Sequence, residues 1–403
     1  MEIEVVRDLQ QLAPLETAWN EAVEASGFDS IFLTHEWFYA WAKSFAPVGA
    51  LNIVIAREEG RICGIMPLLR ERRRSGPLEL TVLRSMSNLQ TYKYNFVLPR
   101  ESGQEVFESM LHLLRRICNW DLMELDYLPD DAQVVTFVRQ MRGKRLFGAR
   151  DEVGMESPYV AIEGTWEDYF DARDKKVRKN WDYFERRLQK EGSVGLIEIA
   201  DGQGLDQAVL DALEIEKSSW KGDRGTAISA SAAETRFYLD LAQAMSRRQN
   251  FRLYFLALDG KKIAFDYCLS YKQSFNVLKT GYDPDFSKNS PGRVLHKTVL
   301  RGLYRDGGYS IYDLLGARDA WKEEWTQTVQ TLLRLRLYNR KPVALTRYAL
   351  GCAADQAKES LRRHPRLFSA AKRLWARLGG KAKLPPSSVS TPASDSGRSQ
   401  DDR

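Results

Sequence analysis

Two stretches of the sequence, about 200 residues apart, have the same succession of predicted elements. Residues 51–69 and 251–270 each read as a strand, a tight turn and a second strand, with Glu59-Gly60 and Asp259-Gly260 at the turns. A third strand, a helix and a fourth strand then follow, at 78–86, 102–117 and 121–128 in the first copy and at 274–282, 291–306 and 309–316 in the second. Because hairpins and helical crossovers alternate in this order, the repeat predicts an α/β fold with mixed sheets, built twice.

The duplication divides the chain into four parts. We expect two domains at 1–155 and 156–345, a basic helical extension at 346–384 and a Pro/Ser-rich, disordered tail at 385–403. Within the second domain, residues 175–190 combine an apolar stripe with many Lys and Arg side chains, which predicts an amphipathic helix. Its basic face is either simply solvated or grips an anionic substrate or RNA.

Composition argues against several classes of protein. The chain of 403 residues is 43% hydrophobic and 28% charged, and no apolar run approaches the roughly 18 residues that span a bilayer. The N-terminus carries early acids and no apolar segment, so we expect no signal peptide. The four cysteines and four histidines are scattered without ligand spacing, so we expect no metal site, and this usage is typical of the reducing cytoplasm.

The helix predicted after residue 290 begins in a way that favours an anion. Ser290 is a good N-cap, Pro291 suits the first helical position, and Gly292 permits close approach to the backbone. Lys288 and Arg293 add positive charge beside the positive end of the helix dipole. The corresponding helix of the first copy opens with glutamates instead. We therefore expect the second copy to hold an anionic cofactor, through Lys288, Ser290, Gly292 and Arg293.

A carboxylate interrupts an otherwise apolar strand of the second copy. Alternation places Ala264, Asp266 and Cys268 on one face, where a charge is costly unless water or a partner reaches it. We expect Asp266 either to face a wet cleft, as a general base, or to pair with a lysine such as Lys279, itself a candidate for substrate contact. On the next strand, Gly281 predicts a bulge or a close backbone approach, with N–H groups free to bind an oxyanion.

Further candidates gather around the fourth strand of the second copy. Asp313 lies at the edge where open sheets expose their ligands, and Lys322 and Trp325 are three residues apart on the following helix. Both can look back at the strand end, Lys322 toward a substrate and Trp325 as an aromatic wall or as core packing. Asp283 is a second acidic candidate, and Trp220 lies where a loop could border the cleft.

Four segments carry a family resemblance: GKKIAFD (260–266), LKTGYDPDFSKNSPGRVL (278–295), DLLGARDAWKEEW (313–325) and the Trp of SSWKGD (218–223). They resemble the acetyltransferase family of the GNAT superfamily associated with cellulose and exopolysaccharide biosynthesis, best over 160–330 and more loosely over 1–345. The arrangement is similar to the Fem-type peptidoglycan aminoacyltransferases. The resemblance implies an α/β fold of two tandem GNAT-like (acyl-CoA N-acyltransferase) domains, the first degenerate. The phosphate loop departs from the usual Gln/Arg-x-x-Gly-x-Gly/Ala, because one glycine is kept and Pro291 replaces an N–H donor.

The resemblance also implies an activity. It is transfer of an acyl group from an acyl-CoA, foremost acetyl-CoA, to an amine or hydroxyl of a sugar or polysaccharide precursor. The attack would be direct, with Asp266 or Asp313 assisting deprotonation and Tyr282 protonating the leaving thiolate. Neither a metal nor a covalent enzyme intermediate is needed. Tyr282, an aromatic at a strand end, can equally be packing.

Two other functions stay open. One is Fem-like, aminoacyl-tRNA-dependent transfer, with the basic helix at 175–190 binding the RNA. The other is a non-catalytic module that binds the polysaccharide-synthesis machinery. Residues 361–383 hold eight Lys or Arg and no acid around a Leu/Trp stripe, which either lies on an anionic membrane or packs on the domain. We expect a cytoplasmic protein, at most peripheral to the inner face of the membrane.

Overall fold

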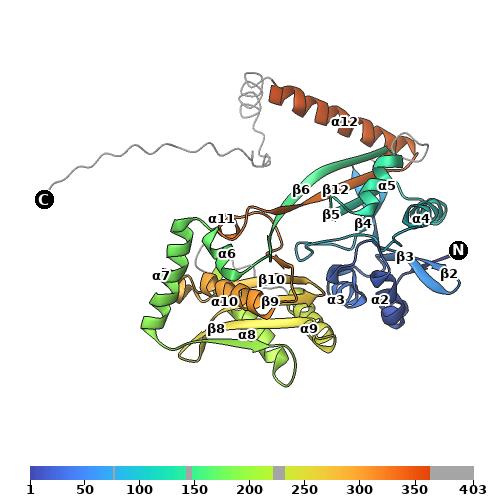
Figure 1. Ribbon diagram of the computed structural model, residues 1–403. Coiled ribbons are helices and arrows are strands. Elements are labelled where there is room, and N and C mark those ends of the chain that lie inside the picture. The colour runs from blue at the N-terminus through green and yellow to red at the C-terminus, as the bar shows by residue number, and fades with distance from the viewer. Residues whose placement is uncertain (76–77, 142–147, 221–231, 364–403) are drawn as a thin grey trace. The chain divides into compact units, whose positions relative to one another are not determined.

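The computed structural model describes residues 1–75, 78–141, 148–220 and 232–363. Residues Met1–Thr346 form one compact unit and Arg347–Arg403 a second. The described strands are β1 (Glu2–Val6), β2 (Leu51–Glu58), β3 (Arg61–Ser75), β4 (Leu78–Ser85), β5 (Leu122–Pro129), β6 (Gly148–Ala161), β7 (Val194–Ile199), β8 (Phe251–Leu258), β9 (Lys261–Tyr271), β10 (Ser274–Tyr282), β11 (Ile311–Asp313) and β12 (Val329–Tyr338) (Figure 1). The described α-helices are α1 (Leu9–Leu12), α2 (Glu16–Glu24), α3 (His35–Phe45), α4 (Gly103–Cys118), α5 (Gln133–Met141), α6 (Trp166–Asp171), α7 (Lys175–Glu191), α8 (Leu205–Trp220), α9 (Ala232–Arg247), α10 (Pro291–Asp306), α11 (Ala320–Glu323) and α12 (Pro342–Arg363).

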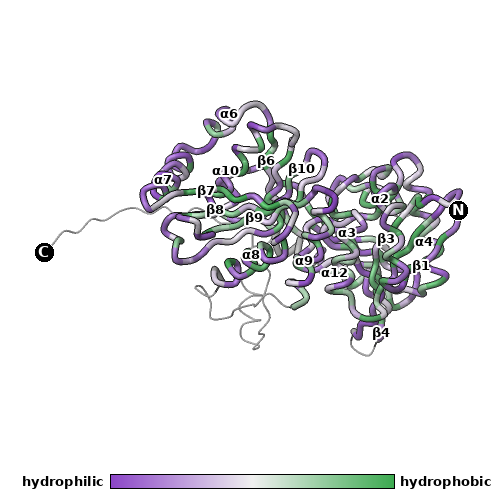
Figure 2. Tube along the Cα trace, turned by 90° about the horizontal axis from the view of Figure 1, so that it is seen from below, coloured by the Kyte–Doolittle hydropathy of each residue, from purple (hydrophilic) through white to green (hydrophobic). Residues whose placement is uncertain are grey.

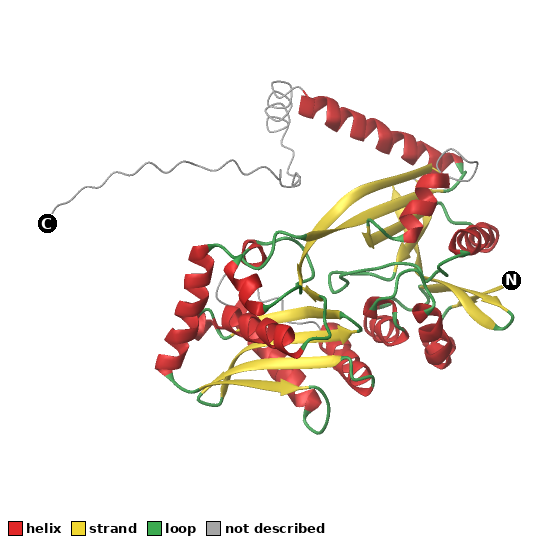
Figure 3. Cartoon of the chain, viewed as in Figure 1, coloured by secondary structure: helices red, strands yellow, loops and turns green. Residues whose placement is uncertain are grey.

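The described strands form one sheet in the order β1-β2-β3-β4-β5-β12-β6-β11-β10-β9-β8-β7 (Figure 3). Neighbours are antiparallel except β4–β5 and β10–β11, which are parallel. Counted from either end, the sheet therefore shows the same order of antiparallel and parallel pairs, and the pair β12–β6 lies at its centre. The run β2-β3-β4-α4-β5 is equivalent to β8-β9-β10-α10-β11, which confirms the predicted duplication and the α/β fold of two tandem GNAT-like halves.

The last strand of each half lies in the other half. β6 follows β5 and α5 along the chain but pairs with β11, whereas β12 follows β11 and pairs with β5. β6 and β12 also pair with each other, and they are the long green and brown strands of Figure 1. Because β6 runs unbroken through residue 155, the predicted boundary there falls inside a strand. The division into domains stays a prediction, and the two halves share one sheet.

Apolar cores form on both faces of this sheet. The larger one joins the halves, and in it the ring of Trp37 on α3 meets Phe237 on α9 edge to face at 5.4 Å. The smaller one lies under α6, α7 and α10 and contains Trp181 stacked on Trp325 at 4.0 Å. In Figure 2, β8 and β9 run through the hydrophobic part of the second half of the chain. The helix α7 is largely hydrophilic there, as predicted for an amphipathic helix. Truncating one buried Trp or Phe typically costs about 3–5 kcal/mol, so the shared core holds the halves together.

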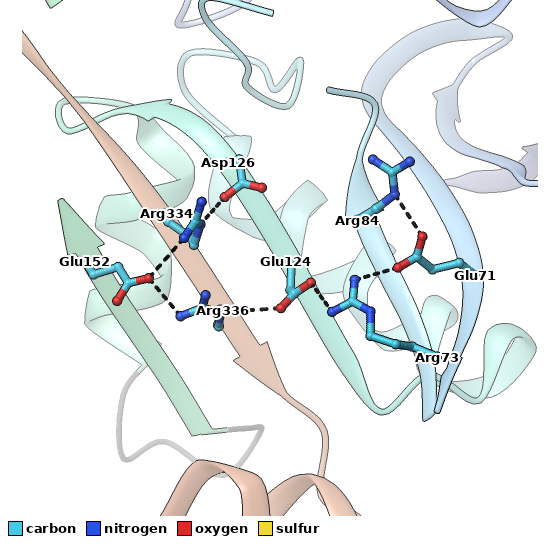
Figure 4. A network of polar contacts seen from close by, with 8 residues as sticks. All are labelled: Glu71, Arg73, Arg84, Glu124, Asp126, Glu152, Arg334 and Arg336. Atoms are coloured by element: carbon cyan, nitrogen blue, oxygen red, sulfur yellow. Dashed lines mark hydrogen bonds and ion pairs between the residues drawn. The ribbon is translucent and has the colours of Figure 1, made fainter. Parts of the chain in front are cut away.

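Side chains of alternating charge cross the neighbouring strands β3, β4, β5, β12 and β6 (Figure 4). They are Glu71, Arg73, Arg84, Glu124, Asp126, Glu152, Arg334 and Arg336. Glu124 on β5 lies 2.7 Å from Arg73 on β3 and 3.5 Å from Arg336 on β12, and Arg336 reaches Glu152 on β6 at 2.9 Å. Because cross-strand pairs of opposite charge stabilise particular neighbours, this network supports the position of β12 between β5 and β6.

Candidate active site

The N-terminus of α10 follows β10 through a short 3-10 helix, η3 (Pro284–Asn289). Pro291 occupies the first turn, as predicted. Ser290 is at the N-cap position, but its backbone is left-handed (φ 43°, ψ 54°) and its side chain makes no capping bond, which corrects the expectation for this residue. Gly292 leaves room beside the helix end, because a Cβ there would lie 3.8 Å from Cδ1 of Tyr282, its nearest neighbour.

Much of the positive charge at this helix end is already paired. Arg293 makes a two-pronged ion pair with Glu324, with both N–O distances at 2.7 Å. Lys297 is 7% exposed, and its Nζ lies 2.7 Å from each of two carboxylates of α7. Lys288 is exposed. An anion here would therefore be held by the helix end and Lys288 more than by Arg293.

Tyr282 and Asp283 lie at the rim of the same edge. The Tyr282 side chain is 40% exposed, beside Gly292. Asp283 accepts a bond from the N–H of Asp285 at 3.1 Å and pairs with Lys261 at 2.8 Å. These contacts fix the turn after β10.

Asp266 is fully buried, so the expectation of a wet cleft beside it is wrong. Its strand, β9, packs under α10, whose His296 places Nδ1 3.2 Å from Oδ2 of Asp266. The alternative pairing with Lys279 is also wrong, because Lys279 binds Glu216 at 2.5 Å. Burial raises the pKa of Asp266 to about 7, since the ionised carboxylate loses its hydration.

His296 belongs to a buried polar cluster that sequence reasoning missed. Its Nδ1 lies 2.7 Å from the hydroxyl of Tyr312 on β11, and the ring of Trp321 stacks on the imidazole with centroids 5.2 Å apart. Burial, helped by Lys322 and Arg293, lowers the pKa of His296 to about 3, so the imidazole is neutral. No local pattern predicts the cluster, because Asp266, His296, Tyr312 and Trp321 come from four different elements, β9, α10, β11 and α11.

β10 and β11 pair at three positions and then part. Their register ends at Asn276 and Asp313. β10 continues to Tyr282, paired with β9, and its ladder shifts between Val277 and Lys279. Among the described strands, the backbone of 277–282 therefore has no ladder partner on the β11 side. Such a bulge is a frequent neighbour of active sites.

A loop of the N-terminal half reaches this bulge. The hydroxyl of Tyr92 donates to the carbonyl of Leu278, and Nζ of Lys93 lies 2.6 Å from Oδ2 of Asp313. Asp313 is 2% exposed and also accepts from the N–H of Leu315 at 2.9 Å. The candidate Asp313 thus lies where the halves meet, with a lysine partner from the other half that the sequence did not indicate.

Helices α8 and α9 cover the bulge from the other face of the sheet. Glu216 of α8 binds Nζ of Lys279 at 2.5 Å, and Nζ lies 4.9 Å from the ring centroid of Tyr238 on α9. Gly281 permits this approach, because a Cβ there would come within 2.6 Å of Phe265 and 3.3 Å of the Glu216 Cα. The close approach expected at Gly281 is confirmed, and the bulge lies earlier in the strand.

The remaining candidates divide between the site and the core. Lys322 is 9% exposed and donates to the carbonyls of Leu315 and Ala317, so it looks back at the end of β11 as predicted. Trp325 is fully buried in the smaller core, where it is packing and not an aromatic wall. Trp220 ends α8, and its side chain lies outside the described part of the structure.

Comparison with known proteins defines the class to which this site belongs. Residues 175–323 match the family model described as an acetyltransferase (GNAT) domain. This range runs from α7 to α11, so the second half carries the GNAT domain and the chain is an acyltransferase. No curated protein matches the sequence closely enough to be counted as a relative.

Solved structures share the tandem fold at low identity. FemX superposes with a TM-score of 0.57 and 11% identity, over 86% of this chain and 100% of FemX. A conserved protein of unknown function from Bacteroides thetaiotaomicron VPI-5482 has a TM-score of 0.53 and 8% identity, over 84% of this chain and 100% of its own. The C-terminal domain of a putative lysylphosphatidylglycerol synthetase from Agrobacterium fabrum reaches 0.50 and 13%, over 83% and 94%. These likenesses concern the fold alone.

Proposed function

We propose that the protein transfers an acetyl or other acyl group from an acyl-CoA to an amine or hydroxyl of a sugar or exopolysaccharide precursor. One observation supports the use of an acyl-CoA. β10 and β11 separate after Asn276 and Asp313, on the edge of the sheet where α10 begins. Lys288, Gly292 and the N-terminus of α10 would hold the phosphates of an acyl-CoA, and the bulge of β10 would offer backbone groups to its thioester. The acceptor class rests on the sequence resemblance.

The helix end fits a pyrophosphate through its backbone. Gly292 leaves room for close approach, the dipole of α10 favours an anion, and the exposed Lys288 adds charge. Pro291 has no N–H, and Arg293 is engaged by Glu324, so these two residues contribute less. When bound, CoA supplies the activated thioester, and the chain holds and orients it.

The Gly292→Glu variant tests this placement. We expect affinity for acetyl-CoA, measured by calorimetry, to fall at least about tenfold, which corresponds to about 1.4 kcal/mol, because the new carboxylate fills the space and repels phosphate. Gly302→Glu is the matched control in the same helix, at a position with open space. Unchanged affinity in a folded Gly292→Glu protein would contradict the proposal. Titrations with succinyl-CoA and free CoA would identify the acyl group.

The outer face of α7 favours a second candidate, transfer from an aminoacyl-tRNA. Its exposed basic side chains are Lys175, Lys176, Lys179, Arg186 and Lys190. Within the described residues, no carboxylate pairs with any of the five, and such a row of cations attracts phosphates. Filter binding of tRNA that weakens steeply between about 50 and 200 mM salt, together with no binding of CoA, would favour this candidate.

Association with a membrane surface through residues 361–383 stays a prediction. The part of this segment beyond Arg363 lies outside the described residues. Among the described helices, none is long and apolar enough to cross a bilayer. The described residues also contain no group of His, Cys, Asp and Glu side chains that could hold a metal ion.

A further inference from the structure

We propose that Glu216 is the general base and Tyr92 the general acid of acyl transfer, acting at the bulge of β10. The inference rests on the proposed function. It makes the N-terminal half a contributor to the active site, because Tyr92 comes from the loop before α4.

The bulge is the place where β10 can meet a thioester carbonyl. β10 loses β11 as a partner after Asn276, and its ladder to β9 shifts between Val277 and Lys279. A bulge leaves a residue outside the ladder, here Leu278, whose backbone is available to other partners. Backbone donors at such a point can stabilise the oxyanion that develops on the carbonyl.

Tyr92 brings a phenol to this point. Its hydroxyl donates to the carbonyl of Leu278. Its ring also borders the end of β11, since Cε1 would lie 3.9 Å from a Cβ on Gly316. The side chain is therefore between the two strands where they part. Burial, with a further contribution from Glu216, raises the pKa of Tyr92, so the phenol keeps its proton at neutral pH.

Glu216 reaches the same region from α8. Its carboxylate binds Lys279, the residue directly after Leu278, at 2.5 Å. After burial itself, Tyr92 and Glu216 are the largest causes of the raised pKa of Tyr238, so these side chains share one environment. The Glu216 side chain is 17% exposed, so it can contact an acceptor, whereas Asp266 lies fully buried under α10.

The two groups complete a balanced reaction. Glu216 takes one proton from the acceptor amine or hydroxyl as the acceptor's nitrogen or oxygen forms a bond to the thioester carbonyl carbon. The carbon–sulfur bond then breaks, and the sulfur takes the hydroxyl proton of Tyr92. Glu216 afterwards releases its proton to solvent, and Tyr92 regains one from solvent. The net reaction consumes acyl-CoA and acceptor and yields CoA and the acylated product.

The Tyr92→Phe variant tests the acid. We expect kcat with acetyl-CoA to fall about 100-fold, with KM for acetyl-CoA changed by less than about twofold. With S-phenyl thioacetate the defect should shrink below about threefold, because a thiophenolate leaves readily without a proton. The matched control is Tyr94→Phe, whose hydroxyl also donates to a backbone carbonyl, that of Pro67, at 2.6 Å. An equal defect with both thioesters would overturn the acid role and leave Tyr92 as a structural contact.

The Glu216→Gln variant tests the base. We expect kcat to fall about 100-fold near pH 7, and the loss to shrink as the pH approaches the pKa of the acceptor amine, which then needs no base. Lys279, Tyr238 and Tyr92 are titratable groups near Glu216 that this substitution leaves unchanged. Glu214→Gln, on the same helix and 66% exposed, is the control. A loss that does not change with pH would overturn the base role.

Both variants are assayed with the acceptor on which the wild type releases most thiol, in a panel of amino sugars and neutral sugars. If the wild type releases none from acetyl-CoA, the proposed function itself fails, and this inference with it. If the wild type transfers the acyl group and both variants match it, the inference alone is overturned.

Discussion

Asp266 and His296 exchange the protonation states that they would have in water. The folded protein raises the pKa of Asp266 from 3.8 to about 7 and lowers that of His296 from 6.5 to about 3. Between about pH 4 and 6.5 the folded pair therefore holds one proton, on Asp266, and the unfolded pair also holds one, on the histidine. Because the number of bound protons does not change on unfolding, the pair adds little pH dependence to stability in this range.

The Asp266→Asn variant should expose this compensation. Only His296 then gains a proton on unfolding, so the free energy of unfolding should rise with pH between about 4 and 6.5, by up to about 1.4 kcal/mol per unit relative to the wild type. His296→Gln should give the opposite slope, with stability falling as pH rises from about 4 to 7, because only the aspartate term remains. Urea unfolding at several pH values measures both. If the free energy of unfolding changed with pH in the same way in all three proteins, the two pKa shifts would be contradicted. Lys322 and Arg293 also lower the pKa of His296, and both stay in the two variants.

Residues with local roles were the ones that the sequence could predict. The close approach at Gly281 could be predicted because a glycine inside a strand often marks one. The direction of the Lys322 side chain could be predicted because this residue lies on the helix that follows β11. Glu216 and Tyr92 were missed because helix carboxylates and loop tyrosines are common and nothing beside them in the sequence marks them. Asp266 was misjudged because the helix that buries it lies about 30 residues further along the chain.

At the scale of elements, periodicity predicted the strands but not their partners. The sequence of β12 alternates as is typical of a strand, yet β12 lies between β5 and β6 and not beside β11, the strand that precedes it along the chain. Strand partners depend on which sheet edge is left unpaired by elements far away in the chain. The charge network gives a partial signal, because the arginines of β12 match the acids of β5 and β6.

Glu124→Gln should measure how much that match contributes. Glu124 bridges Arg73 and Arg336 with its side chain 19% exposed, so we expect the free energy of unfolding to fall by about 1–2 kcal/mol in low salt and less in high salt. Glu79→Gln is the control, because Glu79 lies 3.8 Å from Arg72 with both side chains largely exposed, and should lose less than about 0.5 kcal/mol. Equal losses in urea unfolding would show that the network adds nothing specific to strand placement.

At the scale of the whole molecule, the exchange of β6 and β12 makes the halves interdependent. Without β12, β5 keeps β4 but loses the partner on its other edge, and without β6, β11 keeps β10 but loses the partner on its other edge. The shared core adds Trp37 against Phe237. Neither half retains a complete sheet when the other is removed.

We therefore expect residues 1–346 to unfold in one cooperative transition, and fragments 1–162 and 163–346 not to fold alone. Urea unfolding followed by tryptophan fluorescence and by circular dichroism should give coincident curves for 1–346 and for the full chain. The two fragments should lack a cooperative transition when separate, and regain one when mixed. A fragment that folds cooperatively by itself would show that the exchanged strand is dispensable.

The place of β12 also matters while the chain is being made on the ribosome. β5 ends at Pro129, but its neighbour ends at Tyr338, so the edge of β5 waits for about 200 further residues. At synthesis rates of about 5–20 residues per second, this wait lasts roughly 10–40 s. During that time an unpaired strand edge is open to pairing with other nascent chains. The yield of folded protein in a cell should therefore depend on how long the edge of β5 is unpaired before β12 emerges, as well as on the stability of the finished fold.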